Sequence, residues 1–524
     1  MATGLATDMA TRRRIGAQTA GATSLPAPVG GLNDRDPLAA MPVEDAVILE
    51  NWWPLPSRLR VRNGYAMWAT GFSTAVETIF EYSPPSGLNR LFAASGGSVF
   101  DITAAGPIGA PVVTGQTSNR WQEVSASTPG GNFLYLFNGV DKPQLYDGTT
   151  WQAVDAGSSP IAITGVTTTL LVQGCVFKNR LFMTERDSMR VWYLPVASIG
   201  GAAQAIDFGA IFQRGGWVVG MYTWTIDAGN GADDHAVFLS SNGEVAVYAG
   251  TDPSSASAWS LIGLFYLGVP IGRRCAVKYG GDLLIMCERG VMPLGKSLLS
   301  SSVDRRAAIS DKIQNSVNDA VSAYRNNFGW ELCVFPEQNA LLLNVPQGMG
   351  SNFQFAMNSL TGAWTKFTGW SANTVKNTSL GLYFGDATTV KRAWVGNIDG
   401  GDMIVADGLQ SFQDFGAKAQ NKYFTMVRPY IQTNGRPSIL YGINGDYLPS
   451  APTGTLNYAP PGGMVWGSMI WGSMIWGGSF QQLSNWNTVG GIYHAAALRL
   501  AVQSNSSDVE WASTSFVYQP GGLL

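Results

Sequence analysis

One stretch, residues 310–384, constrains the fold of this chain more than any other. It opens with a helical pattern, with Ser310 as the expected N-cap, in which apolar residues recur every three or four positions. These residues are Ile313, Val317, Ala320, Val321 and Tyr324. Four short apolar runs then follow, joined by turns rich in Pro, Asn, Ser and Gly: Trp330–Phe335, Ala340–Val345, Phe353–Asn358 and Ala363–Phe367. Runs of this length predict a four-stranded antiparallel meander, which is the size of one β-propeller blade.

Looser versions of the same unit recur between about residues 77 and 299. Hairpin signals such as Ser240–Gly243 and Gly280–Asp282 separate short apolar runs there. A tryptophan opens several of the expected strands, at Trp121, Trp151, Trp259 and Trp364. The repetition is irregular, so six to eight blades would fit.

The sequence therefore predicts an all-β protein with three parts. We expect a flexible N-terminal arm at residues 1–30, a β-propeller of four-stranded antiparallel blades with one amphipathic helix at 31–415, and a C-terminal β-rich, sandwich-like domain at 416–524. The last boundary follows from the fading of the blade pattern near residues 413–419.

Composition excludes several functional classes. Lys and Arg (33) nearly balance Asp and Glu (36), and charged residues make up 13% of the chain, about half the usual ~25%. This disfavours a general nucleic-acid binder and suits a protein whose surface is occupied by neighbours. The four cysteines are isolated in apolar runs and read as buried thiols. We expect no metal, no cofactor and no membrane span, since clustered ligands and long apolar stretches are missing from the sequence.

Two stretches are candidates for contacts with other molecules. Trp52 and Trp53 are followed by Arg58, Arg60 and Arg62, which alternate with apolar residues and would form one basic face of an extended segment. That face would contact phosphate or the carboxylates of another subunit, or else be a solvated edge strand.

The second stretch is a period-five Trp-Gly element carrying Trp466, Trp471 and Trp476. It is expected to be an exposed aromatic loop, or to fold back onto its own sheet.

Motifs for chemistry are weak. Gly290–Ser297 satisfies the Walker A pattern, in which Lys296 would contact phosphates and Ser297 would hold Mg²⁺. The preceding strand is expected to be half of a hairpin, whereas a P-loop needs a parallel strand and a following helix. We therefore interpret the segment as structural.

Other catalytic groups are sparse. The two histidines, His235 and His494, suggest no catalytic triad. Asp399, Asp402 and Asp407 would suit calcium or a glycosidase, but carboxylates in turns are the commoner case. We expect no catalytic residues and no enzyme activity.

Several motifs resemble tail proteins of short-tailed bacteriophages, the group of tail nozzle, tail hub and DNA-stabilisation-like proteins. The resemblance rests on Asn51–Pro54 with Arg58–Tyr65, on Ser310–Ile313, Leu343–Pro346, Met357–Trp364, Phe367–Trp370 and Tyr383–Gly385, and on the Trp-Gly repeat with Gly521-Gly522. It implies a structural subunit of a nozzle or hub ring, with six copies that continue and close the DNA channel below the portal and adaptor.

The implied partners are further copies of the chain, the adaptor or portal, tail fibre or spike proteins, and double-stranded DNA in transit without tight binding. The implied location is the virion tail, after synthesis in the host cytoplasm. An alternative is a propeller-fold glycan-binding or glycan-degrading tail protein whose aromatic loop stacks on sugars. A third hypothesis, an NTPase, depends on Lys296.

Overall fold

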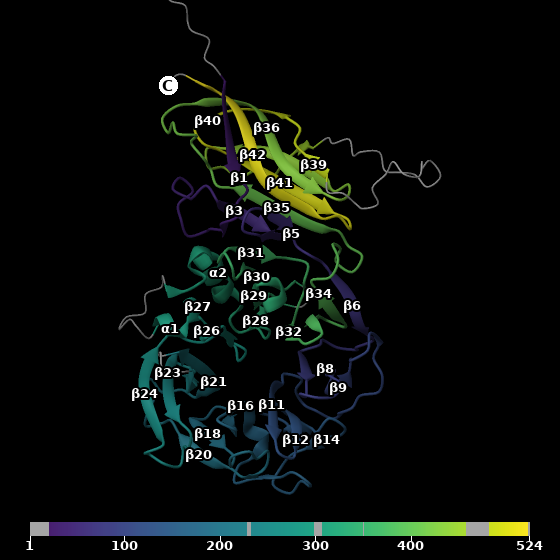
Figure 1. Ribbon diagram of the computed structural model, residues 1–524, viewed down its shortest axis with the longest axis vertical. Coiled ribbons are helices and arrows are strands. Elements are labelled where there is room, and N and C mark those ends of the chain that lie inside the picture. The colour runs from purple at the N-terminus through teal and green to yellow at the C-terminus, as the bar shows by residue number, and fades with distance from the viewer. Residues whose placement is uncertain (1–19, 228–231, 298–306, 349–350, 457–480, 522–524) are drawn as a thin grey trace, which may run out of the picture.

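The computed structural model describes residues 20–227, 232–297, 307–348, 351–456 and 481–521. Strands dominate these residues and form two bodies, a ring of small sheets and a two-sheet body above it (Figure 1). The prediction of an all-β fold, with a β-propeller of antiparallel blades and a sandwich-like module, is confirmed.

Seven small antiparallel sheets form the blades of the propeller in the described part of the chain. From the innermost strand outwards, the first four are β7 Thr78–Tyr82, β8 Arg90–Ser95 and β9 Ser98–Asp101; β11 Gln122–Thr128, β12 Gly131–Phe137, β13 Gln144–Tyr146 and β14 Trp151–Ala153; β16 Leu171–Phe177, β17 Arg180–Glu185, β18 Arg190–Tyr193 and β20 Gln204–Asp207; and β21 Val218–Asp227, β22 Ala232–Ser240, β23 Glu244–Gly250 and β24 Trp259–Tyr266.

The other three blades are β25 Ala276–Tyr279, β26 Asp282–Cys287 and β27 Gly290–Pro293; β28 Glu331–Phe335, β29 Ala340–Val345, β30 Phe353–Asn358 and β31 Trp364–Phe367; and β32 Thr374–Thr378, β33 Gly381–Gly385, β34 Val390–Ala393 and β6 Tyr65–Thr70. The meander expected at residues 330–367 is thus confirmed strand by strand. Short pieces complete this region: β10 Gly106–Pro107 beside β6, β15 Ile163–Thr164 paired with β19 Gly201–Ala202, and one-turn 3₁₀ helices at Thr168–Leu170 and Pro336–Gln338.

The last blade closes the ring with strands from two distant parts of the chain. Its three inner strands come from residues 374–393, and its outermost strand, β6, comes from residues 65–70 and pairs antiparallel with β34. Neighbouring innermost strands contact one another around the channel. Between β7 and β11 the link is a hydrogen bond of 3.1 Å from the Trp121 amide to Thr78 Oγ1. Since β6 completes the last blade and the innermost strands contact one another around the ring, the propeller is closed.

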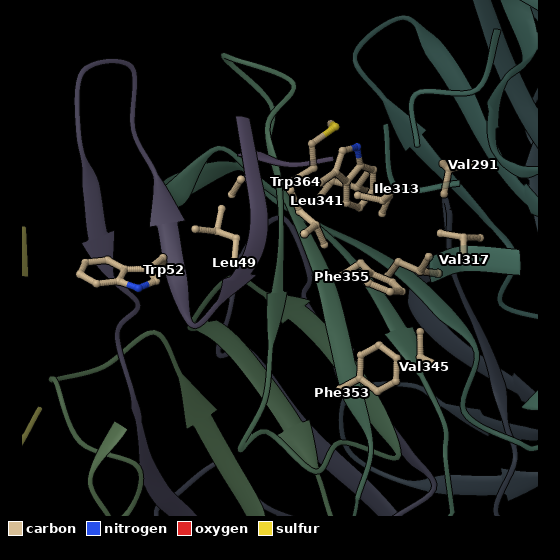
Figure 2. Close-up of a cluster of buried hydrophobic side chains, with 14 of the residues drawn as sticks. Leu49, Trp52, Val291, Ile313, Val317, Leu341, Val345, Phe353, Phe355 and Trp364 are labelled. Atoms are coloured by element: carbon tan, nitrogen blue, oxygen red, sulfur yellow. The ribbon is translucent and has the colours of Figure 1, made fainter. Parts of the chain in front are cut away.

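The amphipathic helix lies between two blades. Residues Asp311–Ile313 form a 3₁₀ turn that leads into α2, Gln314–Tyr324. The expected apolar face is confirmed, since Ile313 and Val317 are buried between Val291 of β27 and Leu341 of β29 (Figure 2). Ser310 does not cap the helix with its side chain; its hydroxyl accepts a hydrogen bond of 3.1 Å from the Val291 amide instead.

The second body is a sandwich of two sheets. One sheet contains β1 Gly21–Pro26, β4 Trp52–Pro54, β5 Leu59–Val61, β36 Lys422–Thr433, β39 Gln481–Leu483, β40 Asn487–Tyr493 and β42 Val509–Pro520. The other contains β2 Gly31–Leu32, β3 Asp45–Glu50, β35 Ile404–Gln410, β37 Ser438–Gly445, β38 Gly454–Thr455 and β41 Ala496–Ser504. Buried apolar residues of both sheets, such as Phe424, Val427, Leu498 and Leu500, form its core.

The sandwich and the propeller share one sheet. Strand β31, the outermost of its blade, pairs in parallel with β3 at Lys366 and Glu50, so the blade continues into the second sandwich sheet. The large buried cluster in Figure 2 is also common to both bodies, with Leu49 and Trp52 on the sandwich side and Phe353 and Trp364 on the blade. The two bodies are therefore joined by packing as well as by the chain.

The expected domain boundaries need correction. Strands β1, β3 and β5, in residues 21–61, pair with strands from the C-terminal part of the chain, for example Gly21 with Tyr518. Strands β2 and β4 pair in turn with β3 and β5, so all five belong to the sandwich. The propeller strands span residues 65–393, and the sandwich resumes at β35. The expected arm at residues 1–30 is wrong for residues 21–26, which form β1, and residues 1–19 lie outside the described residues. Hydrogen bonding to β42 explains this difference, because it is a tertiary pairing that no local pattern shows.

Candidate functional site

The site that stands out lies at the end of the channel where the innermost strands begin. The connections between blades meet there, among them residues 325–330, the loop between α2 and β28. Three neighbouring cavities share residues of this loop. We call this end of the propeller the entry face.

Arg274, just before β25, closes the channel at the entry face. Its Nη1 donates to Thr374 Oγ1 at 2.8 Å and to Glu331 Oε2 at 3.3 Å. Its Nη2 donates to Thr78 Oγ1 at 2.8 Å and to the Trp121 carbonyl at 3.1 Å. These partners belong to four other blades, so one guanidinium connects several blades at the centre of the propeller.

A second ion pair lies nearby in the same channel. Lys376 of β32 binds Glu123 of β11, whose other carboxylate oxygen accepts the Glu81 amide of β7 at 3.1 Å. Burial alone would lower the pKa of Lys376, but the attraction of Glu123 outweighs it and the pKa is raised. The channel is thus spanned by fixed, mutually compensated charges.

Next to Arg274, a cavity of about 400 Å³ opens at the entry face. Its lining combines residues from blades that are far apart in sequence. Five arginines line it, and no carboxylate does: Arg120, Arg186, Arg273, Arg274 and Arg325. We call it the arginine cavity.

The loops around the arginine cavity are held by buried polar groups. Asp141 accepts hydrogen bonds from the amides of Thr117 and Ser118 and, at 2.7 Å, from Asn138 Nδ2. Burial would raise the pKa of Asp141, but these donors outweigh it and the pKa lies below its ordinary value. On the opposite side, Asn344 Nδ2 donates to the Gly329 carbonyl at 2.8 Å. The cavity therefore has walls fixed by the fold.

The arginines differ in how their charges are compensated. Three of them have acidic partners: Arg120 with Glu77 at 3.0 Å, Arg274 with Glu331 at 3.3 Å and Arg186 with Asp187 at 3.7 Å. Phe328 also lies under two guanidinium groups, with its ring centroid 4.3 Å from Arg120 Cζ and 5.4 Å from Arg274 Cζ. Arg273 and Arg325 form no ion pair with any carboxylate of the described residues. The cavity consequently keeps a net positive charge.

The arrangement is suited to binding. Apart from the arginines, the lining consists of Ser118, amides, glycines and apolar residues, and it includes no His, Cys, Lys, Asp or Glu. It thus lacks a general base beside a nucleophile. Elsewhere in the described residues, no group of three or more His, Cys, Asp or Glu side chains is placed to hold a metal ion.

The expected contact residues lie mostly inside the protein. Trp52 and Trp53 are 0% and 2% exposed and point to different bodies. Trp52 packs on Trp511 of the sandwich with ring centroids 5.9 Å apart, and Trp53 packs on Trp394 of the propeller at 5.3 Å. Strand alternation explains this division, since successive side chains of β4 leave opposite faces. Neither indole is available to a second protein in this fold.

Arg62 is also internal, with 1% of its side chain exposed. All five of its N–H donors are used. They reach Asp399 Oδ1 at 2.9 Å and Oδ2 at 2.6 Å, Asn51 Oδ1 at 2.8 Å, and the carbonyls of Asn63 at 2.9 Å and Thr368 at 2.5 Å. Arg62 thus fastens the chain where it passes from sandwich to propeller.

The other two arginines of this segment are more accessible. Arg58 pairs with Glu510 at 2.8 Å, and Arg60 donates to Asn63 Oδ1 at 2.6 Å. The prediction that they contact a partner stays a prediction. The expected aromatic loop of Trp466, Trp471 and Trp476 lies outside the described residues.

The Walker-like segment lies in a hairpin. Strand β27 pairs antiparallel with β26, and α1 after it spans only Leu294–Ser297. The Gly295 amide donates to Asp282 Oδ1 at 2.9 Å, an internal contact. Among the expected turn carboxylates, Asp399 binds Arg62 and Asp407 binds Arg499, so neither is a free ligand. The four cysteines are free thiols, three buried and Cys175 partly buried.

No local pattern in the sequence predicted the arginine cavity. Its five arginines come from four connections spread over residues 120–325. The adjacent pair Arg273-Arg274 before an expected strand was the one local signal. Only the circular order of the blades brings these connections together.

Fold and site together define a β-propeller with a basic entry face, inserted into a β-sandwich. No family model matches the chain, and no curated protein matches it. Solved structures that match include two crystal structures of BBS1N in complex with ARL6DN, one soaked with mercury and one with lead. Both are 12% identical to this chain and cover 63% of it, with 97% and 98% of their own length and TM-scores of 0.38 and 0.39.

These comparisons correct the expectation from the sequence resemblance. The solved structures reported are of BBS1N and not of a phage tail protein, and no family or curated protein supports a tail nozzle or hub. The comparisons give no support to a tail nozzle or hub subunit, or to the alternative of a glycan-binding or glycan-degrading tail protein, and neither prediction is carried further. One of the motifs that suggested the tail proteins contains Trp52, Trp53 and Arg62, and these three side chains are buried inside the protein. The virion location stays a prediction.

The partner prediction is retained in its general form. Protein partners are compatible with this fold. In the described residues no helix is long and apolar enough to cross a membrane.

Proposed function

We propose that this protein is a non-catalytic binding scaffold that holds an anionic partner at its entry face. The main support is the arginine cavity, a space of about 400 Å³ that is lined by five guanidinium groups and no carboxylate. Guanidinium groups bind carboxylates and phosphates through paired, charge-assisted hydrogen bonds. A rigid ring and fixed loops keep these donors in place before a partner arrives, which lowers the entropic cost of binding.

The lack of catalysis is part of the proposal. Two of the arginines are already engaged in closing the channel or packing on Phe328, and no general base lies among them. The partner that fits presents anionic groups, and a protein segment rich in acidic side chains is one form of it. Its association would be fast and would weaken as salt rises, because opposite charges steer the encounter.

The test is binding of a fluorescently labelled Glu-rich peptide, followed by anisotropy at two salt concentrations. Arg325→Ala should weaken binding roughly tenfold, as expected for loss of a hydrogen bond to a charged group. Arg436→Ala, an exposed arginine in the turn between β36 and β37, is the matched control and should leave binding unchanged. Equal binding by all three proteins, or cleavage of the peptide, would refute the scaffold proposal.

The hexameric state predicted from the sequence stays a prediction. Mass photometry of the purified protein tests it, since six copies of a 55.9 kDa chain are readily distinguished from one. A homogeneous monomer at micromolar concentration would refute it.

A further inference from the structure

The arginine cavity contains a charge that the fold itself does not satisfy. Arg273 lies in the connection before β25, and its Nη1 is buried without a hydrogen-bond partner among the described residues. Burial lowers the pKa of the Arg273 guanidinium below its ordinary value, against the opposing attraction of Asp187. An arginine nevertheless stays protonated at neutral pH. A charged group whose buried donor has no acceptor is costly in a finished fold, and an anion bound against the accessible part of the same guanidinium would offset that cost by charge attraction.

Two further guanidinium groups face the same space. Arg325, at the end of α2, is exposed and has no ion pair with a carboxylate of the described residues, and Arg186 follows β17. Arg186 uses Nη1 to hold the Gly139 carbonyl at 2.6 Å, and its nearest carboxylate, on Asp187, is 3.7 Å away. The three arginines belong to three separate connections of the ring. An anion in the cavity would therefore be surrounded by guanidinium groups from three separate parts of the chain.

We propose that the arginine cavity binds the terminal phosphate of a small phosphorylated molecule, with Arg273 and Arg325 as its principal contacts and Arg186 as the third. The inference rests on the proposed function and names the chemical group that the entry face recognises. A planar carboxylate is matched by one guanidinium fork, whereas a tetrahedral phosphate offers oxygens in several directions and carries close to two charges. Donors converging from three connections fit the phosphate better.

The size of the cavity supports a ligand larger than phosphate alone. A volume of about 400 Å³ lies within the ~300–1,000 Å³ range of small-molecule sites. Val140, Val172 and Phe328 supply apolar lining beside the arginines. The phosphate would thus sit on Arg273 while the rest of the molecule contacts this apolar wall.

The test uses inorganic pyrophosphate as the probe, with isothermal titration calorimetry in chloride buffer. Wild type should bind it, and Arg325→Ala and Arg273→Met should each weaken binding roughly tenfold or more. Arg436→Ala is the control and should bind as wild type. Equal pyrophosphate binding by all four proteins, or none by wild type, would overturn the inference.

A thermal shift measurement guards against variants that merely misfold. Arg273→Met should melt at or above the wild-type temperature in phosphate-free buffer, because it removes an unpaired buried charge, and should lose the rise that pyrophosphate causes in wild type. A rise in melting temperature that is the same in wild type and Arg273→Met would count against the site.

Further arms identify the source of the phosphate and separate the two proposals. A phosphoserine peptide tests a phosphate carried by a partner, and a single-stranded oligonucleotide tests phosphodiesters. Tighter binding of the oligonucleotide than of pyrophosphate, with the same dependence on Arg325, would overturn the assignment to a terminal phosphate. If the Glu-rich peptide binds and pyrophosphate does not, only this inference fails; if neither binds, the scaffold proposal fails as well.

Discussion

Replacing Arg62 by alanine should destabilise the protein far more than replacing any exposed arginine. The change leaves the Asp399 carboxylate, with a side chain only 8% exposed, without its cation. Asn51, Asn63 and Thr368 also lose their hydrogen-bond donor. Removing one partner of a buried ion pair costs about 3–5 kcal/mol, because the remaining charge stays desolvated.

The measurement is urea denaturation followed by tryptophan fluorescence. Trp53 and Trp394, on the propeller side of this joint, are among the 18 tryptophans whose emission reports unfolding of the whole chain. Arg58→Ala is the internal control. Its pair with Glu510 leaves 44% of the Arg58 side chain exposed, and such pairs contribute about 0–1 kcal/mol.

A double variant sharpens this test. Arg62→Ala combined with Asp399→Ala removes both charges, so it should recover part of the stability lost in the single variant. The reasoning would be refuted if Arg62→Ala lowered the urea midpoint no more than Arg58→Ala. It would also be refuted if the double variant lost as much as the two single changes added together.

Three other predictions address the ring, the joint and the helix. Burial alone would raise the pKa of Asp386, but hydrogen bonds from Lys391 and from backbone amides hold it below its ordinary value. Asp386 therefore stabilises the last blade, β32–β34 with β6, above about pH 4, the unfolded-state pKa, and this stability is lost as pH falls through the folded pKa. Asp386→Asn should reduce the fall in melting temperature at acidic pH. A fall as steep as that of wild type would contradict this. Trp53→Ala should cost about 3–5 kcal/mol in urea titrations by leaving a cavity against Trp394, and a loss below 1 kcal/mol would argue against its burial. Val317→Asp should prevent α2 from packing and increase cleavage near residues 314–324 in limited proteolysis, and a digestion pattern like that of wild type would disprove this.

The blade at residues 331–367 shows what local sequence can predict. Its four strands are consecutive, each pairs with the next, and the turns between them carry their own residue preferences. Three of the tryptophans expected to open strands, Trp151, Trp259 and Trp364, begin the outermost strand of their blades. The local sequence pattern was sufficient to predict those strands that pair with their neighbours in the sequence.

Pairing between distant segments explains what could not be predicted. The number of blades depended on β6, whose partner β34 lies more than 300 residues away in the chain. Strands β3 to β5 have the same alternation as a blade, so nothing in residues 45–61 indicated that they pair with β35 and β42. The arginine cavity depended in turn on the order of the blades. The burial of Arg62 beside the more accessible Arg58 and Arg60 could not be predicted, because a buried arginine and an exposed one look alike in sequence.

Pairing of the first described strand with the last has a consequence during synthesis. Gly21 of β1 lies opposite Tyr518 of β42, so the ribosome must add 497 residues after one partner before the other exists. At ~5–20 residues per second this interval lasts roughly 25–100 s. Trp52 and Trp53 are synthesised early in that period, long before Trp511 and Trp394, on which their rings pack in the folded protein. The N-terminal strand therefore stays without its partner for nearly the whole of synthesis, while the strands of the inner blades can pair as they emerge.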